Sequence, residues 1–175
     1  MILLTFGTRP EYIKIKPLID IFDKHAYDYK VLFTGQHTTL LPAAAYSVID
    51  ISLDIKNGVN RLDSIVGSLM NQSHIWINNL SYILVQGDTT SAFSLALAAF
   101  HRRIPIIHLE AGLRTFDIYN PYPEEFNRQA ISKIASIHFC PTSLSAQNLR
   151  NEGVENGIYI TGNTVLDNLV DIVST

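Results

Sequence analysis

The sequence predicts an α/β fold built as a Rossmann-like doubly wound parallel sheet. Short apolar runs alternate with longer amphipathic segments along the 175-residue chain, which is typical of strand–helix repeats joined by right-handed crossovers. The runs are apolar throughout rather than at every second residue, as expected for parallel strands covered on both faces. With 47% hydrophobic and 17% charged residues, the chain has the composition of a globular domain long enough to bury a core.

The apolar runs predict six strands and one weaker candidate. The six are Ile2–Phe6, Tyr29–Thr34, Tyr82–Gln86, Pro105–Leu109, Ile137–Cys140 and Ile158–Thr161, and the weaker one is Ser52–Ile55. The helices expected around them are Arg9–His25, Leu40–Val48, Arg61–Asn78, Thr89–Arg102, Glu124–Ala135, Ser143–Glu152 and Thr164–Val173.

The first helix has a clear start signal. Thr8-x-x-Glu11 forms a capping box, and Pro10 falls in the first turn, where proline is well tolerated. Pro17 lies inside the same helical pattern, so it should kink the helix or shift its start.

Composition argues against several classes of protein. The net charge of −3 offers no basic field for nucleic acid, and no Cys/His spacing indicates a metal site. Cys140 is the single cysteine, so we expect a small buried apolar residue rather than half of an intrachain disulfide. No apolar run has the length of a membrane span, and Met1–Phe6 has no basic region of a signal peptide. We therefore expect a cytoplasmic protein with no membrane partner.

Three carboxylates lie where open α/β sheets build their sites. Within the stretch Ile104–Arg128, Glu110 ends an apolar run and Glu124 opens a helix, while Asp88 follows the preceding strand. Because the carboxyl ends of parallel strands line one edge, Asp88 and Glu110 should share a crevice. Like charge and partial burial there would suit proton transfer. Taken alone, Asp88 is better explained as a helix N-cap, and Glu124 as a first-turn acid.

Basic residues near the same edge favour an anionic ligand. Arg9 and Lys14 follow the glycine turn after the first strand, at a helix start. A capped helix with solvated cations explains this turn equally well when it is taken alone. The G-x-G-x-x-G and Walker A patterns are absent. Arg114 and Arg128 are plausible partners for the acids or for a phosphate, whereas His108 is expected to be a hydrogen-bonded core residue.

Six motifs together resemble one family. They are Gly7-Thr8-Arg9-Pro10-Glu11-x-x-Lys14, Thr34-Gly35-Gln36-His37, Val85-Gln86-Gly87-Asp88-Thr89, His108-x-Glu110-Ala111-Gly112-Leu113-Arg114-Thr115, Pro123-Glu124-Glu125-x-Asn127-Arg128 and Thr161-Gly162-Asn163-Thr164-Val165-x-Asp167. In that order and spacing, the chain resembles the N-terminal half of the non-hydrolysing UDP-N-acetylglucosamine 2-epimerases. The resemblance covers essentially the whole chain.

The resemblance implies one half of a GT-B-like enzyme, in which two Rossmann-like domains face each other across a cleft. Residues 1–175 would be the N-terminal domain. In the family, the C-terminal domain supplies most of the contacts to UDP and a catalytic histidine. That domain has no counterpart in these residues. We therefore expect this chain to be a truncated form that is inactive alone.

The family's reaction interconverts UDP-GlcNAc and UDP-ManNAc, a precursor of cell-surface polysaccharides, without an external cofactor. It removes the sugar C2 proton as UDP leaves, forming 2-acetamidoglucal, and then re-protonates C2 on the other face as UDP returns. The resemblance maps the family's carboxylates to Asp88, Glu110 and Glu124, with no individual assignment of acid and base. It maps the substrate-contacting cations to Arg9 and Lys14, and Arg114 is a further substrate-binding candidate.

The resemblance also implies regulation and assembly. In some bacterial members, a second UDP-GlcNAc binds as an activator, through residues that match Gln36, His37 and Arg61. The segment Thr38–Pro42 departs from those members, because it lacks their second glutamine. The family is usually a homodimer. The segment Leu62–Trp76 has apolar residues that could contribute to a dimer interface or to the core.

Other functions stay open at this point. One alternative is a hydrolysing UDP-GlcNAc 2-epimerase, an epimerase of a modified UDP-sugar, or a GT-B transferase. The intact motifs at Arg9–Glu11 and Pro123–Glu125 argue against a hydrolase or a transferase. The other alternative is a stand-alone, non-catalytic domain that binds a sugar nucleotide or another protein.

Overall fold

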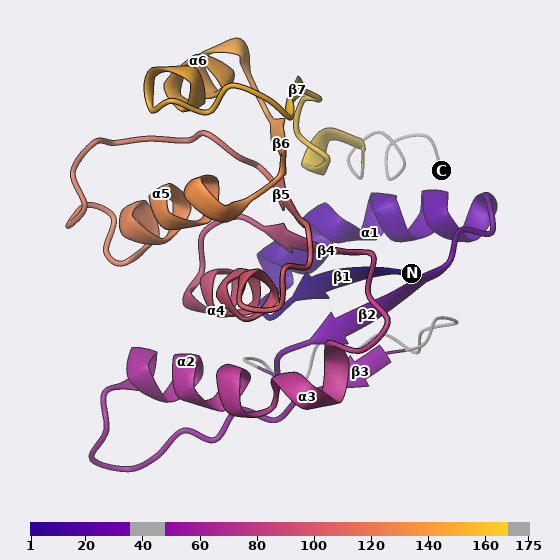
Figure 1. Ribbon diagram of the computed structural model, residues 1–175, viewed down its shortest axis with the longest axis vertical. Helices are drawn as coiled ribbons and strands as arrows, with labels where there is room; N and C mark the ends of the chain where they lie inside the picture. The colour runs from indigo at the N-terminus through magenta and orange to yellow at the C-terminus, as the bar shows by residue number, and fades with distance from the viewer. Residues whose placement is uncertain (36–47, 168–175) are drawn as a thin grey trace.

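Seven parallel strands form a single sheet in the computed structural model, which describes residues 1–35 and 48–167. The order across the sheet is β3-β2-β1-β4-β5-β6-β7 (Figure 1). The strands are β1 (Ile2–Phe6), β2 (Tyr29–Phe33), β3 (Val48–Asp50), β4 (Tyr82–Gln86), β5 (Ile106–Leu109), β6 (Ile137–Cys140) and β7 (Ile158–Ile160). The chain winds outward in both directions from β1 and β4, so the predicted doubly wound fold is confirmed.

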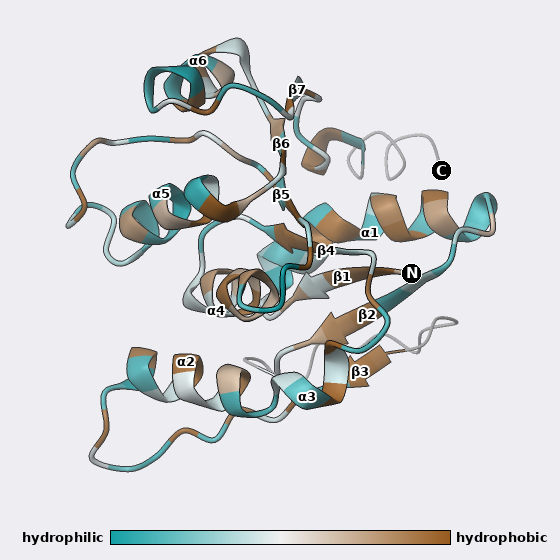
Figure 2. Ribbon diagram, viewed as in Figure 1, coloured by the Kyte–Doolittle hydropathy of each residue, from teal (hydrophilic) through white to brown (hydrophobic). Residues whose placement is uncertain are grey.

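Helices cover both faces of the sheet. They are α1 (Arg9–Lys24), α2 (Arg61–Asn71), α3 (Ser73–Trp76), α4 (Thr90–Phe100), α5 (Glu124–Ile134) and α6 (Ser143–Asn151). One buried cluster joins Ile15 and Ile19 of α1 to the strands, and a second joins α2, α4 and α5 to the other face. Figure 2 shows the strands and α4 coloured as hydrophobic and much of α5 and α6 as hydrophilic. The strands lie between two helical layers, and α4 packs between α2 and α5, so both are buried.

The start of α1 follows the sequence signal. Thr8 Oγ1 accepts a hydrogen bond from the backbone N–H of Glu11 at 3.4 Å, and the Glu11 side chain returns to the backbone N–H of Thr8 at 2.8 Å. Pro17 lies buried inside the helix, which still begins at Arg9. Pro17 therefore does not shift the helix start.

Two predicted elements differ in the structure. The weaker strand prediction, Ser52–Ile55, is wrong, because the third strand lies just before it, at Val48–Asp50. Backbone pairing with β2 fixes this register, with Val31 opposite Val48, and the sequence carries no local signal for it. The single helix predicted over Arg61–Asn78 is divided into α2 and α3 at Gln72. The Ser73 hydroxyl donates to the carbonyl of Met70 at 2.7 Å, and this bond accompanies the break.

Two other predicted helices fall mainly outside the described residues. The helix predicted over Leu40–Val48 lies in that part, except that Val48 begins β3. Of the helix predicted over Thr164–Val173, residues 165–167 are helical, and the remainder lies outside the described residues.

The segment Leu62–Trp76 contributes mostly to the core. Ile65, Leu69 and Trp76 are buried in the cluster beneath α4, whereas Ile75 is 51% exposed. Core packing therefore explains the largest of these side chains, and the dimer stays a prediction. None of the helices in the described ranges is long and apolar enough to cross a bilayer.

Candidate active site

The turns after β1 and β4 meet at the point where the strand order reverses, and Glu11 joins them. Its buried carboxylate accepts hydrogen bonds from the backbone N–H groups of Gly7 at 2.7 Å and Thr8 at 2.8 Å. Its other oxygen accepts from the Thr89 hydroxyl at 2.8 Å. Burial raises the pKa of Glu11, and the hydrogen bonds oppose that shift. Glu11 thus fixes the position of both turns at the crevice where open α/β sheets bind ligands.

Glu110 follows β5 and lies in this crevice. Its oxygen Oε2 forms an ion pair with Lys14 of α1 and accepts a hydrogen bond from Gln86 Nε2 at 2.5 Å. The backbone φ of Glu110 is +67°, in the left-handed region that costs a residue with a side chain about 1–2 kcal/mol. Strained backbone of this kind is concentrated at functional sites, because the surrounding contacts must hold it.

Asp88 follows β4 and is bound by Arg128 of α5. Arg128 Nη2 lies 2.5 Å from Asp88 Oδ2, and only 12% of the arginine and 22% of the aspartate side chain are exposed. Burial raises the pKa of Asp88, Arg128 opposes the rise, and the charges of Glu110 and Glu124 add to it. The charges of Glu110 and Glu124 therefore act on Asp88, which follows the strand next to β5. A carboxylate with a raised pKa is suited to exchanging protons.

The hydrogen bonds around Asp88 also settle how α4 begins. Thr89, and not Asp88, is the N-cap residue, since its hydroxyl accepts from the backbone N–H of Ala92 at 3.1 Å. The N-cap role that local sequence favoured for Asp88 is therefore wrong. The Asp88 carboxylate instead forms the ion pair with Arg128.

The backbone of this turn is held from two sides. His108 Nε2 donates to the carbonyl of Gly87 at 2.8 Å, and Asn127 Nδ2 donates to the carbonyl of Asp88 at 2.9 Å. Burial lowers the pKa of His108 to about 3, so its ring is neutral near pH 7 and acts as a fixed donor. The predicted role of His108 as a hydrogen-bonded core residue is confirmed.

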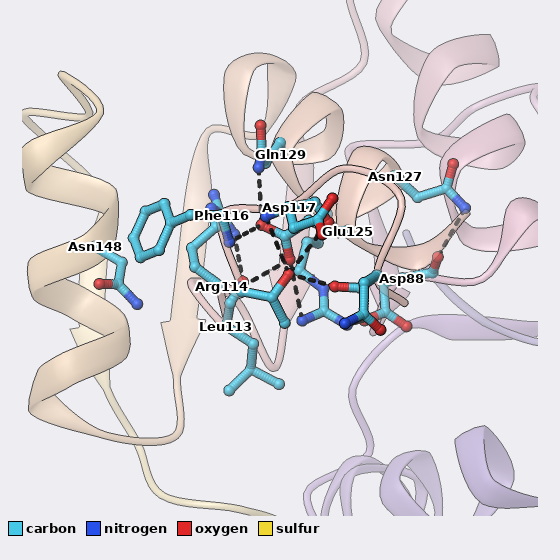
Figure 3. A network of polar contacts seen from close by, with 12 residues as sticks. Asp88, Leu113, Arg114, Phe116, Asp117, Glu125, Asn127, Gln129 and Asn148 are labelled. Atoms are coloured by element: carbon cyan, nitrogen blue, oxygen red, sulfur yellow. Dashed lines mark hydrogen bonds and ion pairs between the residues drawn. The ribbon is translucent and has the colours of Figure 1, made fainter. Parts of the chain in front are cut away.

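Glu125 connects α5 to the loop after β5. Its buried carboxylate accepts from the backbone N–H groups of Thr115 and Phe116, each at 3.1 Å, and from Gln129 at 2.8 Å. Arg128 Nη1 lies 3.4 Å from the same carboxylate. Burial alone would raise the pKa of Glu125, but the donors around it lower the pKa. Figure 3 shows Glu125 between Gln129 and the loop, with Asp88 close by.

The predicted cations occupy different settings. Lys14 is in the cluster, and Arg9 is exposed at the first residue of α1, with no described residue pairing with it. The side chain of Arg114 is fully buried, and its Nε and Nη2 atoms bind both oxygens of Glu152 at 2.6 and 2.8 Å. It also donates to Ser132 Oγ and to the carbonyl of Leu113. In this structure, Arg114 therefore joins α5 to the end of α6, and its N–H groups serve the protein itself.

The residues expected at a regulatory site are only partly described. Gln36 and His37 lie outside the described residues. Arg61 is exposed at the first residue of α2. A small pocket beside the carboxylate cluster is lined by Lys14, Glu110, Pro141, Asn163 and Thr164, among others, so part of the last predicted motif lies at the site. Within the described ranges, no group of three or more metal-ligating side chains is present.

Sequence reasoning missed two residues of the site. Glu11 was placed in a capping box, but its bond to Thr89 joins segments that are far apart in the sequence. Gln86 was part of a motif without a role, and it binds Glu110. For Gln86 the available signal is its position at the end of β4, whereas Glu11 lies in the first turn of α1. A polar residue that closes a buried strand, such as Gln86, points to the same edge as the acids.

The fold and the site together define a doubly wound α/β domain with a carboxylate-lined ligand crevice. The family model for UDP-N-acetylglucosamine 2-epimerase matches residues 20–175, and the chain belongs to this family. A UDP-N-acetylglucosamine 2-epimerase of Campylobacter jejuni is 44% identical, over 96% of this chain and 46% of its own length.

Solved structures agree with this placement. A crystal structure of UDP-N-acetylglucosamine 2-epimerase superposes with a TM-score of 0.86 at 36% identity, over 97% of this chain and 47% of that chain. The Neisseria meningitidis UDP-GlcNAc 2-epimerase bound to UDP-GlcNAc gives 0.84 at 37% identity, over 99% and 48%. This chain therefore spans about half the length of the relatives that it matches.

Proposed function

We propose that this chain is the N-terminal, carboxylate-bearing half of a UDP-N-acetylglucosamine 2-epimerase that interconverts UDP-GlcNAc and UDP-ManNAc. The observation that carries the proposal is that Asp88 and Glu110 follow the adjacent strands β4 and β5 at one edge of the sheet, each bound by a cation, with Glu124 at the start of the next helix. Membership of the family supports it, as does the relative whose structure contains UDP-GlcNAc.

The chemistry of the reaction fits this arrangement. Epimerisation at C2 needs one group that removes the C2 proton and one that returns a proton to the other face. Elimination of UDP also develops negative charge on the departing phosphate. The three carboxylates are the proton-transfer candidates. Lys14 and the exposed Arg9 are the candidates for binding the diphosphate. Arg114 would hold α5 against the end of α6 rather than contact the sugar nucleotide.

The complete enzyme would have a second domain facing this one across a cleft, and it would act in cell-surface polysaccharide precursor synthesis in the cytoplasm. A homodimer is part of the same proposal. Regulation by a second sugar nucleotide would involve Gln36, His37 and Arg61.

The proposal is tested by assaying UDP-GlcNAc turnover with this chain and with an extended protein, which continues through the half that the relatives have. We expect only the extended protein to form UDP-ManNAc, and we expect Asp88→Asn, Glu110→Gln and Glu124→Gln each to abolish the activity. Release of free ManNAc with UDP would instead indicate a hydrolysing enzyme. If neither protein acts on UDP-GlcNAc, the proposed substrate is wrong.

A further inference from the structure

Gln86 and Lys14 both donate to the same oxygen of Glu110. Gln86 is the last residue of β4, where it lies opposite Leu109 in the sheet, and its Nε2 reaches Glu110 Oε2 at 2.5 Å. Lys14 approaches the same Oε2 from α1. Among the described residues, no hydrogen bond ends on Oε1. One oxygen of this carboxylate is therefore held by the protein, and the other is free to accept a proton.

The two donors, Lys14 and Gln86, differ in their exposure and in their charge. Lys14 has 22% of its side chain exposed and lines the small pocket beside Asn163 and Thr164, so a ligand anion can compete for it. Gln86 is only 3% exposed and uncharged. A phosphate would attract Lys14 through its charge but has no comparable attraction for a buried amide.

From these contacts we propose that Gln86 is a positioning residue for Glu110. It keeps Oε2 fixed and Oε1 directed at the substrate, while Lys14 moves from the carboxylate to the anionic group of the sugar nucleotide. Without Gln86, the binding of substrate would leave Glu110 Oε2 without either of the two donors that hold it. The inference rests on the proposed function, since it assigns Gln86 a part in the same proton transfer.

The test uses kinetics of the extended protein with UDP-GlcNAc. Gln86→Met keeps the length of the side chain and suits its burial, but it removes the donor. Hydrogen bonds to charged groups are worth enough for a loss of about tenfold to a hundredfold in kcat. The KM should change by less than about threefold, because Gln86 does not touch substrate. Deuterium incorporation at C2 in D2O should fall in parallel with kcat.

Two variants separate positioning from a general effect on folding. Gln86→His keeps a neutral N–H donor of similar reach and should recover most of the lost kcat. Gln72→Met is the matched control, because the Gln72 amide donates to Ser52 O and Ser68 Oγ at the end of α2 and to none of the three carboxylates. It should leave kcat and KM unchanged.

The outcomes for the two proposals are distinguishable. If the unsubstituted extended protein does not act on UDP-GlcNAc, the proposed function fails, and this inference fails with it. If that protein is active and Gln86→Met keeps kcat within about twofold, only the role of Gln86 is overturned. A crystal structure of Gln86→Met with Glu110 unmoved, together with a low kcat, would also overturn the positioning role.

Discussion

Replacing Arg114 by methionine should destabilise the fold strongly. The guanidinium is fully buried and binds both oxygens of Glu152, so the substitution leaves the Glu152 carboxylate without its main partner. It also removes donors from Ser132 Oγ and the Leu113 carbonyl. Removing one partner of a buried ion pair usually costs 3–5 kcal/mol, and the 19% exposure of the Glu152 side chain favours the lower end, about 3 kcal/mol.

The loss should be visible in thermal and urea unfolding of the 175-residue chain. For a domain of this size, about 3 kcal/mol lowers Tm by roughly 6–12 °C. Lys133→Met is the matched control: Lys133 donates to the backbone carbonyl of Glu152 but is exposed. Lys133→Met should change the free energy of unfolding by no more than about 0.5 kcal/mol.

A double-mutant cycle that combines Arg114→Met with Glu152→Gln then measures the interaction between these two residues. We expect a coupling free energy of about 1–3 kcal/mol. An Arg114→Met protein that unfolds within about 1 °C of the unsubstituted chain would refute this reasoning. If it also lost affinity for UDP-GlcNAc in the extended protein, a direct substrate contact would be favoured instead.

Three further predictions concern the same region. Gly112→Ala should lower the free energy of unfolding by at least about 2 kcal/mol in urea titrations, because the new Cβ would lie 2.2 Å from the Ser145 carbonyl oxygen at a φ of +84°. The buried ring of His108 has its pKa lowered from 6.5 to about 3, so the unfolded state binds the extra proton and the folded state loses stability as pH falls through this window. This loss is up to about 1.4 kcal/mol per pH unit and should be smaller in His108→Gln, as measured by unfolding between pH 7 and pH 4. Glu125→Gln should cost at least about 2 kcal/mol and speed hydrogen exchange of the two loop N–H groups that it binds, since a buried charged acceptor is lost.

Local sequence was sufficient to predict the structural features that one short segment determines. The main strands follow from runs such as Tyr82–Gln86, because continuous apolar residues suit a strand buried on both faces. The start of α1 follows from Thr8 and Glu11, which lie three residues apart. The positions of Asp88 and Glu110 at one edge follow from the parallel topology alone.

Features that depend on distant partners were not predictable in this way. The register of β3 comes from its pairing with β2. Arg114 is paired with Glu152 at the end of α6, and no local signal at Arg114 distinguishes an internal ion pair from a ligand contact. The bond between Gln86 and Glu110 likewise requires the two strands to be side by side. Such contacts depend on tertiary geometry, which a pattern of residue types does not encode.

The most direct test of the central claim is hydrogen exchange at C2 of the sugar. The extended protein is incubated with UDP-GlcNAc in D2O, and the products are followed by NMR. Our account predicts deuterium at C2 of both UDP-GlcNAc and UDP-ManNAc, and it predicts that Asp88→Asn, Glu110→Gln and Glu124→Gln each reduce this incorporation while the protein stays folded. Formation of UDP-ManNAc without deuterium at C2, or full incorporation in all three variants, would contradict it.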